Sequence, residues 1–167
     1  NPTLDSQNNR HNIGFKIIDA INQKYSLSKQ KPKFKGLLTT GNIGNKKIYA
    51  IKPLTFMNNS GICIRELLEY FKMDVDDVIV FHDDIDIHLG SVRAKFGGGS
   101  AGHNGIESID KNIGKNYSRI RIGIGRPTKN STGADHVLDN FSTEEKQSIA
   151  DVTNSIISSF SFTFSLS

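Results

Sequence analysis

The arrangement of apolar residues constrains the fold most strongly, because two different periods alternate along the chain. Apolar residues at helical spacing predict a first helix over residues 13–24 and later helices that begin near Ser60, Gly105 and Ser142. Ser60 is expected to be the N-cap of its helix. Short segments with the patterns of strands lie at residues 37–38, 48–51, 78–81, 92–96 and 120–124. Helices that alternate with strands in this way indicate an α/β fold.

The length and composition fit a single folded unit. The chain has 167 residues, of which 36% are hydrophobic and 23% are charged, so it can bury a core without disulfides. Neither an internal repeat nor a linker interrupts it. We therefore expect residues 1–167 to form one α/β domain, with a mixed twisted sheet surrounded by helices. The alternation of polar with mainly aromatic residues over residues 159–167 predicts a further strand at the end of the chain.

Charge is distributed unevenly along the chain. Residues 1–55 contain ten lysines and arginines but two acids, and residues 93–126 contain seven lysines and arginines but two acids. Six aspartates lie between these two segments, over residues 74–86. Such segregation favours an anionic partner on one face, although a solvated surface can have the same composition.

The cysteine content and hydropathy indicate where the protein works. Cys63 is the single cysteine and lies in an apolar stretch, which fits a buried thiol in a reducing compartment. The sequence has no run of about 18 apolar residues and no leader-like start. We therefore expect a cytoplasmic protein that does not bind membranes.

The glycine-rich segment at residues 97–105 matches three patterns. A dinucleotide site would need an acidic residue about 20 positions further on, where Arg119 and Arg121 stand instead. A nucleophile elbow would place Ser100 as a catalytic serine, with Asp135 and His136 following in the order of a serine esterase. An anion cradle needs only close backbone approach and the free amides of the helix that follows.

Five strings of the sequence, in the same order, resemble one family closely: the bacterial-type peptidyl-tRNA hydrolases. The resemblance is strongest over residues 1–140. The strings are Asn1-Pro2 with residues 10–14, residues 52–61, residues 82–86, residues 97–105 and residues 119–127. The resemblance implies hydrolysis of the ester bond in peptidyl-tRNA, which would recycle tRNA from aborted translation. Two alternatives remain: a family-like RNA-binding protein without activity, and a serine esterase that uses Ser100.

The resemblance assigns the catalytic residues. It implies that His11 is the general base and that Asp83 fixes the tautomer of its ring, in a mechanism without metal or cofactor. A histidine suits this role because its ordinary pKa, about 6.5, leaves the ring mostly neutral near pH 7. The residues that the resemblance implies for substrate binding are Asn1, Phe56, Met57, Asn58, His103 and Asn104.

The resemblance also implies a tRNA partner. Lys95 and Arg121 match the basic pair that clamps a terminal phosphate in this family, and such contacts should weaken with salt. We expect the protein to act as a monomer.

Two departures from the family pattern concern the start of the chain. Thr3 and Ser6 stand where the family usually has a glycine and a tyrosine, which affects a turn and a contact near the site. The family also has a strand before the position of Asn1, so the resemblance implies a gap in the sheet.

A metal site has little support in the sequence. Asp84, Asp86 and His88 resemble the start of a calcium loop, but Leu89 stands where that loop needs glycine.

Overall fold

The computed structural model describes residues 10–127 and 132–165. Helices and strands alternate as expected, and the α/β fold class is confirmed. The short helices are η2 (Arg10–Asn12), η3 (Met57–Asn59) and η4 (Val75–Asp77). The α-helices are α1 (Ile13–Lys24), α2 (Ser60–Phe71), α3 (Asn104–Ile113), α4 (Gly133–Leu138) and α5 (Thr143–Ser165). The strands are β1 (Lys31–Lys33), β2 (Gly36–Ile43), β3 (Lys46–Pro53), β4 (Ile79–Asp84), β5 (Val92–Phe96) and β6 (Ser118–Gly123).

The strands form two sheets of three strands each. One is antiparallel, in the order β1-β2-β3. The other is mixed, in the order β4-β6-β5, with β4 parallel and β5 antiparallel to β6. The strands β3 and β4 are therefore edge strands of their sheets. Both line a cavity of about 570 Å³.

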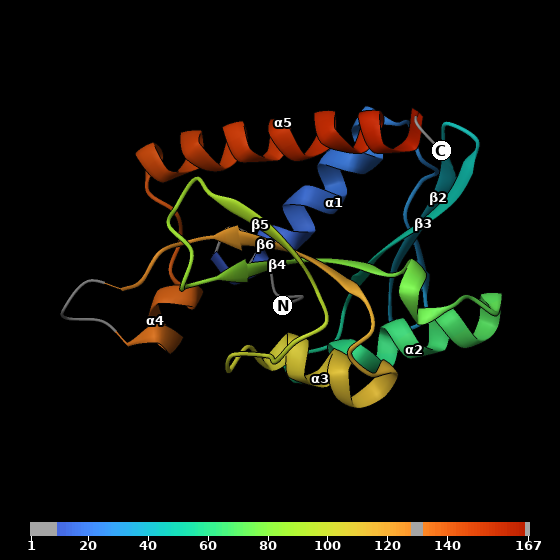
Figure 1. Cartoon of the computed structure of the whole chain (residues 1–167), viewed down its shortest axis with the longest axis horizontal. Coiled ribbons are helices and arrows are strands. Elements are labelled where there is room, and N and C mark those ends of the chain that lie inside the picture. The colour runs from blue at the N-terminus through green and yellow to red at the C-terminus, as the bar shows by residue number, and fades with distance from the viewer. Residues whose placement is uncertain (1–9, 128–131, 166–167) are drawn as a thin grey trace.

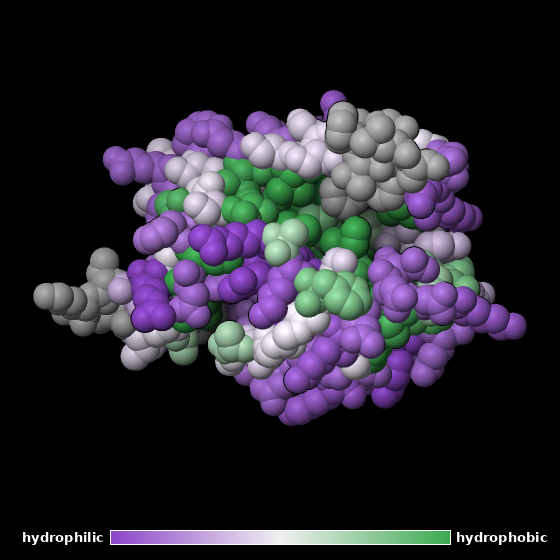
Figure 2. Space-filling view, viewed as in Figure 1, coloured by the Kyte–Doolittle hydropathy of each residue, from purple (hydrophilic) through white to green (hydrophobic). Residues whose placement is uncertain are grey.

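Helices cover both faces of the strands, as Figure 1 shows: α1 and α5 lie on one side, and α2 and α3 lie on the other. The first side has a core built around Ile13 and Ile17 of α1 and Ile122 of β6, all fully buried. The second side has a core in which Leu67, Ile106 and Tyr117 join α2 to α3 and to the chain before β6. On the face drawn in Figure 2, apolar surface lies in a hollow between α5 and the strands, with hydrophilic surface around it.

The ends of two helices agree closely with their sequence patterns. The first helix has the bounds expected for residues 13–24. At the start of α5, the Ser142 hydroxyl accepts from the Glu145 amide at 3.2 Å, and the Glu145 carboxylate accepts from the Ser142 amide at 2.6 Å. This reciprocal pair is a capping box, which explains why the helix begins there.

Two expectations were wrong. Ser60 is the first residue of α2 rather than its N-cap, because a short helical turn at residues 57–59 leads directly into α2, and the Ser60 hydroxyl donates to the Met57 carbonyl at 2.9 Å. Residues 159–165 are helical rather than a strand, since α5 continues to Ser165. Extending an existing helix requires no new nucleation, whereas a strand needs a neighbouring edge to pair with.

The strand β5 is more exposed than its pattern suggested. All five of its residues are exposed, including Phe96 at 60%, because β5 lies at the end of its sheet. Over the described ranges, no helix has the length and apolar character needed to cross a membrane.

Candidate active site

The centre of the site is a contact between His11 and Asp83. His11 lies in η2 at the start of α1, and Asp83 lies near the end of β4. The Nδ1 atom of His11 is 2.9 Å from each carboxylate oxygen of Asp83. Asp83 is 3% exposed, so this carboxylate is taken out of water and needs hydrogen-bond donors. The structure thus brings together the two residues that the sequence resemblance assigned to catalysis.

Arg10 holds the turn before α1 against the start of α5. Its Nη2 atom is 2.9 Å from a Glu145 carboxylate oxygen, and its Nη1 atom donates to the His136 carbonyl at 3.2 Å. Arg10 is 8% exposed, and a largely buried guanidinium pair of this kind has a restricted geometry. The contact links His11 to the beginning of α5.

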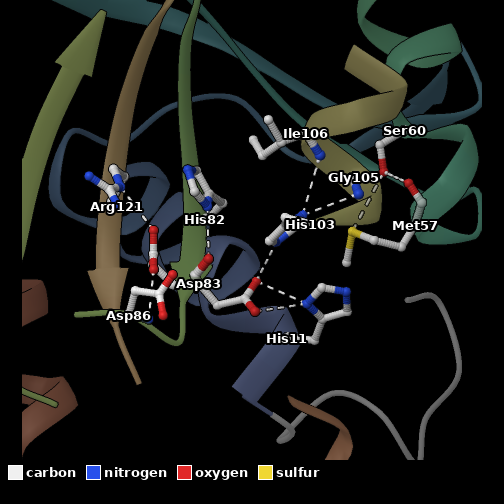
Figure 3. A network of polar contacts seen from close by, with 11 residues as sticks. His11, Met57, Ser60, His82, Asp83, Asp86, His103, Gly105, Ile106 and Arg121 are labelled. Atoms are coloured by element: carbon white, nitrogen blue, oxygen red, sulfur yellow. Dashed lines mark hydrogen bonds and ion pairs between the residues drawn. The ribbon is translucent and has the colours of Figure 1, made fainter. Parts of the chain in front are cut away.

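A second histidine approaches the same carboxylate. The Nε2 atom of His103 is 2.8 Å from Asp83 Oδ1, and its Nδ1 atom accepts from the amides of Gly105 at 3.1 Å and Ile106 at 3.3 Å. His103 is therefore the N-cap of α3. Figure 3 shows both rings at the carboxylate of Asp83, and their centroids are 4.8 Å apart.

The contacts of His103 fix the tautomers of both rings. Because Nδ1 of His103 accepts from two amides, the proton of the neutral ring is on Nε2 and points to Asp83. An ionised carboxylate only accepts, so Nδ1 of His11 donates to it and Nε2 of His11 keeps its lone pair. In Figure 3 that second nitrogen of His11 points away from Asp83. An open lone pair is what a general base requires.

The electrostatics keep Asp83 ionised. Burial alone would raise the pKa of Asp83, but the electrostatic interactions and hydrogen bonds with His103 and His11 outweigh it and hold that pKa well below its ordinary value. For His103, burial lowers the pKa, but the Asp83 carboxylate outweighs burial and leaves the pKa raised.

His82 was not among the residues expected from the sequence. It is 9% exposed, its ring lies 5.1 Å from that of His103, and its Nδ1 atom lies 2.8 Å from the Asp83 carbonyl oxygen and donates to it. Burial, helped by the charge of His103, lowers the pKa of His82 to about 4, so the ring is neutral near pH 7. Its place beside Asp83, at the start of the string at residues 82–86, was the available signal.

Apolar residues border the site. Met57 and His11 line the cavity of about 570 Å³, together with side chains of α1, β3 and β4. The Met57 Sδ atom would lie 2.6 Å from a Cβ atom at position 105, so a larger residue there would displace the Met57 side chain. Phe56 is 66% exposed beside Met57, where a ligand could contact it.

Two of the asparagines expected in the site, Asn58 and Asn104, lie beside it. Asn58 and Asn104 line a smaller cavity of about 150 Å³ between η3, α2 and α3. No hydrogen bond joins either of them to His11 or Asp83 in the described part of the chain. Each is adjacent in sequence to a residue of the site, Met57 or His103. Asn1, Thr3 and Ser6 lie outside the described residues.

The basic residues lie on one face of the mixed sheet. Lys95 is exposed on β5, and Arg121 on β6 is paired with Asp84, with 2.9 Å between Nε and Oδ2. Arg119 is buried instead: its guanidinium donates to the carbonyls of Gly99 at 2.8 Å and Gly98 at 3.1 Å. Arg119 thus supports the glycine-rich segment rather than facing a partner.

One group in the described ranges could hold a metal ion. The ligand atoms of His11, Asp83 and His103 lie within 4.8 Å of one another. The nitrogens that face Asp83 are already used in hydrogen bonds, and the other nitrogen of His103 caps α3. A cation here would have to replace these contacts.

The geometry does not assemble a serine esterase. Asp135 and His136 lie in α4, where Asp135 contacts Thr132 and His136 contacts the Ile124 carbonyl. Ser100 has no hydrogen bond to either residue in the part of the chain that the structure describes.

Comparison with known proteins identifies the family. The sequence profile described as Peptidyl-tRNA hydrolase matches residues 1–166. The chain belongs to the peptidyl-tRNA hydrolase family. It is 71% identical to the peptidyl-tRNA hydrolase of Pelagibacter ubique over 159 residues, which cover 95% of this chain and 86% of that one. It is 50% identical to that of Bartonella henselae over 147 residues, which cover 88% and 76% of the two chains.

Solved structures of the family have the same fold. The crystal structure of peptidyl-tRNA hydrolase from Acinetobacter baumannii matches with a TM-score of 0.89 and 32% sequence identity, over 94% of this chain and 81% of that one. The family resemblance read from the five sequence strings is confirmed. Neither the serine esterase nor the inactive RNA-binding protein receives support from these comparisons.

Proposed function

We propose that this chain hydrolyses the ester bond between peptide and tRNA in peptidyl-tRNA, with His11 as the general base. The reaction would return tRNA from aborted translation to use. The observation that carries the proposal is the distance of 2.9 Å between His11 Nδ1 and the buried Asp83 carboxylate. That contact leaves Nε2 of His11 free to accept a proton from water.

The chemistry needs one water molecule and no cofactor. His11 Nε2 takes a proton from water while the oxygen of that water attacks the ester carbonyl carbon. The tetrahedral intermediate carries a negative oxygen, and its collapse breaks the bond to the ribose oxygen. His11 then returns the proton to that oxygen, which gives a free ribose hydroxyl and a peptide carboxylic acid. Asp83 stabilises the protonated ring between these two steps.

Neutral amide side chains suit the remaining roles. We assign Asn1, Asn58 and Asn104 to the water, the ester and the peptide backbone, since an amide both donates and accepts without charge. One donor aimed at the developing oxyanion can contribute about 2.7–4 kcal/mol to the transition state. Phe56 and Met57 would contact apolar side chains of the peptide. We assign His103 to the support of Asp83 rather than to direct contact with substrate, because both of its nitrogens are already used.

Lys95 and Arg121 would bind RNA phosphate, which would make binding weaker as salt rises. We further propose that the protein works as a monomer in the cytoplasm. A reducing compartment fits the free Cys63, which is fully buried and whose pKa burial raises to about 12, so the thiol is unreactive.

Replacement of His11 tests the proposal. His11→Ala should lower the turnover of an N-acyl-aminoacyl-tRNA about 10²–10⁴-fold, the usual contribution of a general base. Binding of the same RNA should stay close to that of the unchanged protein. His88→Ala is a matched control, because His88 is exposed and lies outside the site. Full turnover by the His11→Ala variant would refute the mechanism, and no release of peptide by the unchanged protein would refute the function.

A further inference from the structure

Arg93 and Arg121 lie directly opposite each other in the mixed sheet. The register pairs Arg93 of β5 with Arg121 of β6, and it pairs Arg121 with His82 of β4. Residues opposite each other in an antiparallel pair point to the same face, so the two arginines share one face. Like charges in this relationship are destabilising unless an anion lies between or beside them.

One of the two arginines has a buried carboxylate beside it. The Asp84 side chain is 10% exposed and that of Arg121 is 26% exposed. Asp84 Oδ2 accepts from Arg121 Nε at 2.9 Å, while Asp84 Oδ1 accepts from the Asp86 amide at 2.9 Å. The second contact fixes the carboxylate, and the first therefore fixes the guanidinium. Figure 3 shows Arg121 beside β4, on the side of His82 that faces away from His11.

This contact leaves the outer edge of the Arg121 guanidinium available. A guanidinium has five N–H donors, and Asp84 uses the one on Nε. The two terminal nitrogens of Arg121 make no hydrogen bond in the described ranges, and Arg93 has no acidic partner there. Two nitrogens that point the same way match two oxygens of a phosphate.

Lys95 lies on the same face but is not the residue opposite Arg121. It lies opposite Arg119 in the register, two positions along β5 from Arg93. Its Nζ atom would lie 2.5 Å from a Cβ atom at position 98, so its end lies against the glycine-rich segment. The residue that faces Arg121 directly is therefore Arg93.

We propose that Asp84 is a positioning residue, which orients Arg121 so that Arg121 and Arg93 together bind a phosphate group of the RNA. This inference rests on the proposed function, since it assumes that the substrate carries RNA. The phosphate is either the 5′-terminal group or one between nucleotides, and both present the same oxygens to the arginines.

Steady-state hydrolysis of peptidyl-tRNA with a 5′-phosphate or a 5′-hydroxyl tests this inference. Asp84→Ala should raise KM about tenfold with kcat within a factor of two, because it disorders a charge-assisted contact and leaves the reacting groups alone. Arg93→Ala should act in the same direction. Asp86→Ala is the matched control, since its carboxylate pairs with the exposed Arg126 and its backbone amide remains. Asp84→Asn, which keeps the size of the side chain, replaces Asp84→Ala if the alanine variant does not fold.

The outcomes are distinct. A rise in KM confined to the 5′-phosphorylated substrate identifies the terminal phosphate. A similar rise for both substrates, with a shallower dependence of KM on salt, identifies a phosphate between nucleotides. A fall in kcat at unchanged KM, or an Asp84 variant that matches Asp86→Ala, overturns the inference. If the unchanged protein hydrolyses neither substrate, the proposed function fails instead.

Discussion

The Nδ1 atom of His11 lies 2.9 Å from both carboxylate oxygens of Asp83, although the two residues are 72 positions apart in the chain. The contact exists because α1 packs against β4, with His11 in the turn before α1 and Asp83 near the end of β4. His103 donates to the same carboxylate from the start of α3. One buried carboxylate therefore accepts a hydrogen bond from each of two imidazoles, and this arrangement determines what substitutions at the site should do.

Asp83→Asn should lower kcat about 10²–10⁴-fold while KM changes little. The amide offers one acceptor and one donor group in place of two acceptors. His103 keeps its proton on Nε2 because its Nδ1 accepts from the amides of Gly105 and Ile106. His11 must then accept from the amide through Nδ1, which puts its proton on Nε2 and removes the base. Turnover measured at saturating substrate checks this, and a variant within threefold of the unchanged protein would contradict it.

Two substitutions of His103 should separate its two roles. His103→Asn can still cap α3 through its side-chain oxygen but is too short to reach Asp83, whereas His103→Ala does neither. Both variants should lose similar activity, because both remove a donor from the Asp83 carboxylate. The alanine variant should be less stable than the asparagine variant by about 1 kcal/mol, the value of an N-cap. Urea unfolding and kcat measured on both variants test this, and equal stabilities would rule out the capping role.

The local structure could be predicted from the sequence where a local rule decides it. The helix at residues 13–24 follows from its apolar spacing, and the start of α5 follows from its capping box. The N-cap rule gave the wrong start for α2 at Ser60, because the short helix at residues 57–59 continues directly into α2. The strand expected from the alternating pattern after residue 159 was also wrong, because the long helix α5 continues through these residues.

The site could be predicted only in part, because it depends on contacts between distant segments. Family resemblance selected His11 and Asp83, but no spacing rule could show that Asp83 is shared with His103. Arg10, His82 and Asp84 lie in the strings that resemble the family, but the strings do not show their contacts, since each contact depends on which residue lies opposite in the folded chain. The register of β5 and β6, which places Arg93 rather than Lys95 opposite Arg121, is likewise a property of the sheet.

Stability should fall as the pH drops from 6.5 to 4 because of His82. Burial lowers the pKa of His82 to about 4 in the folded protein, against about 6.5 in the unfolded chain. Between these values the unfolded chain binds a proton that the folded protein does not, so the free energy of unfolding rises with pH in this window. The loss at pH 4 relative to pH 6.5 is on the order of 3 kcal/mol.

The variant His82→Asn isolates this effect. Asparagine can still donate to the Asp83 carbonyl, but it does not titrate. Urea unfolding of both proteins at several pH values should therefore show that the unchanged protein loses stability relative to the variant as the pH falls. Parallel curves from pH 6.5 to 4 would show that His82 is not the group responsible.

Gly61→Ala should weaken both the fold and the site, because α2 and α3 pack closely at this residue. A Cβ atom at position 61 would lie 2.1 Å from the Ser108 carbonyl oxygen, and the Gly61 amide donates to the Ser108 hydroxyl at 3.0 Å. The two helices must then separate, at a cost of about 1–3 kcal/mol for overpacking. Since α3 carries His103 at its start and His103 supports Asp83, kcat should fall as well.

Gly133→Ala is a suitable control, because its added Cβ would make an ordinary contact at 3.7 Å with Ile85. Thermal unfolding and kcat of the two variants test the coupling, and a Gly61→Ala protein with lowered stability but unchanged kcat would show that the position of α3 does not control the site.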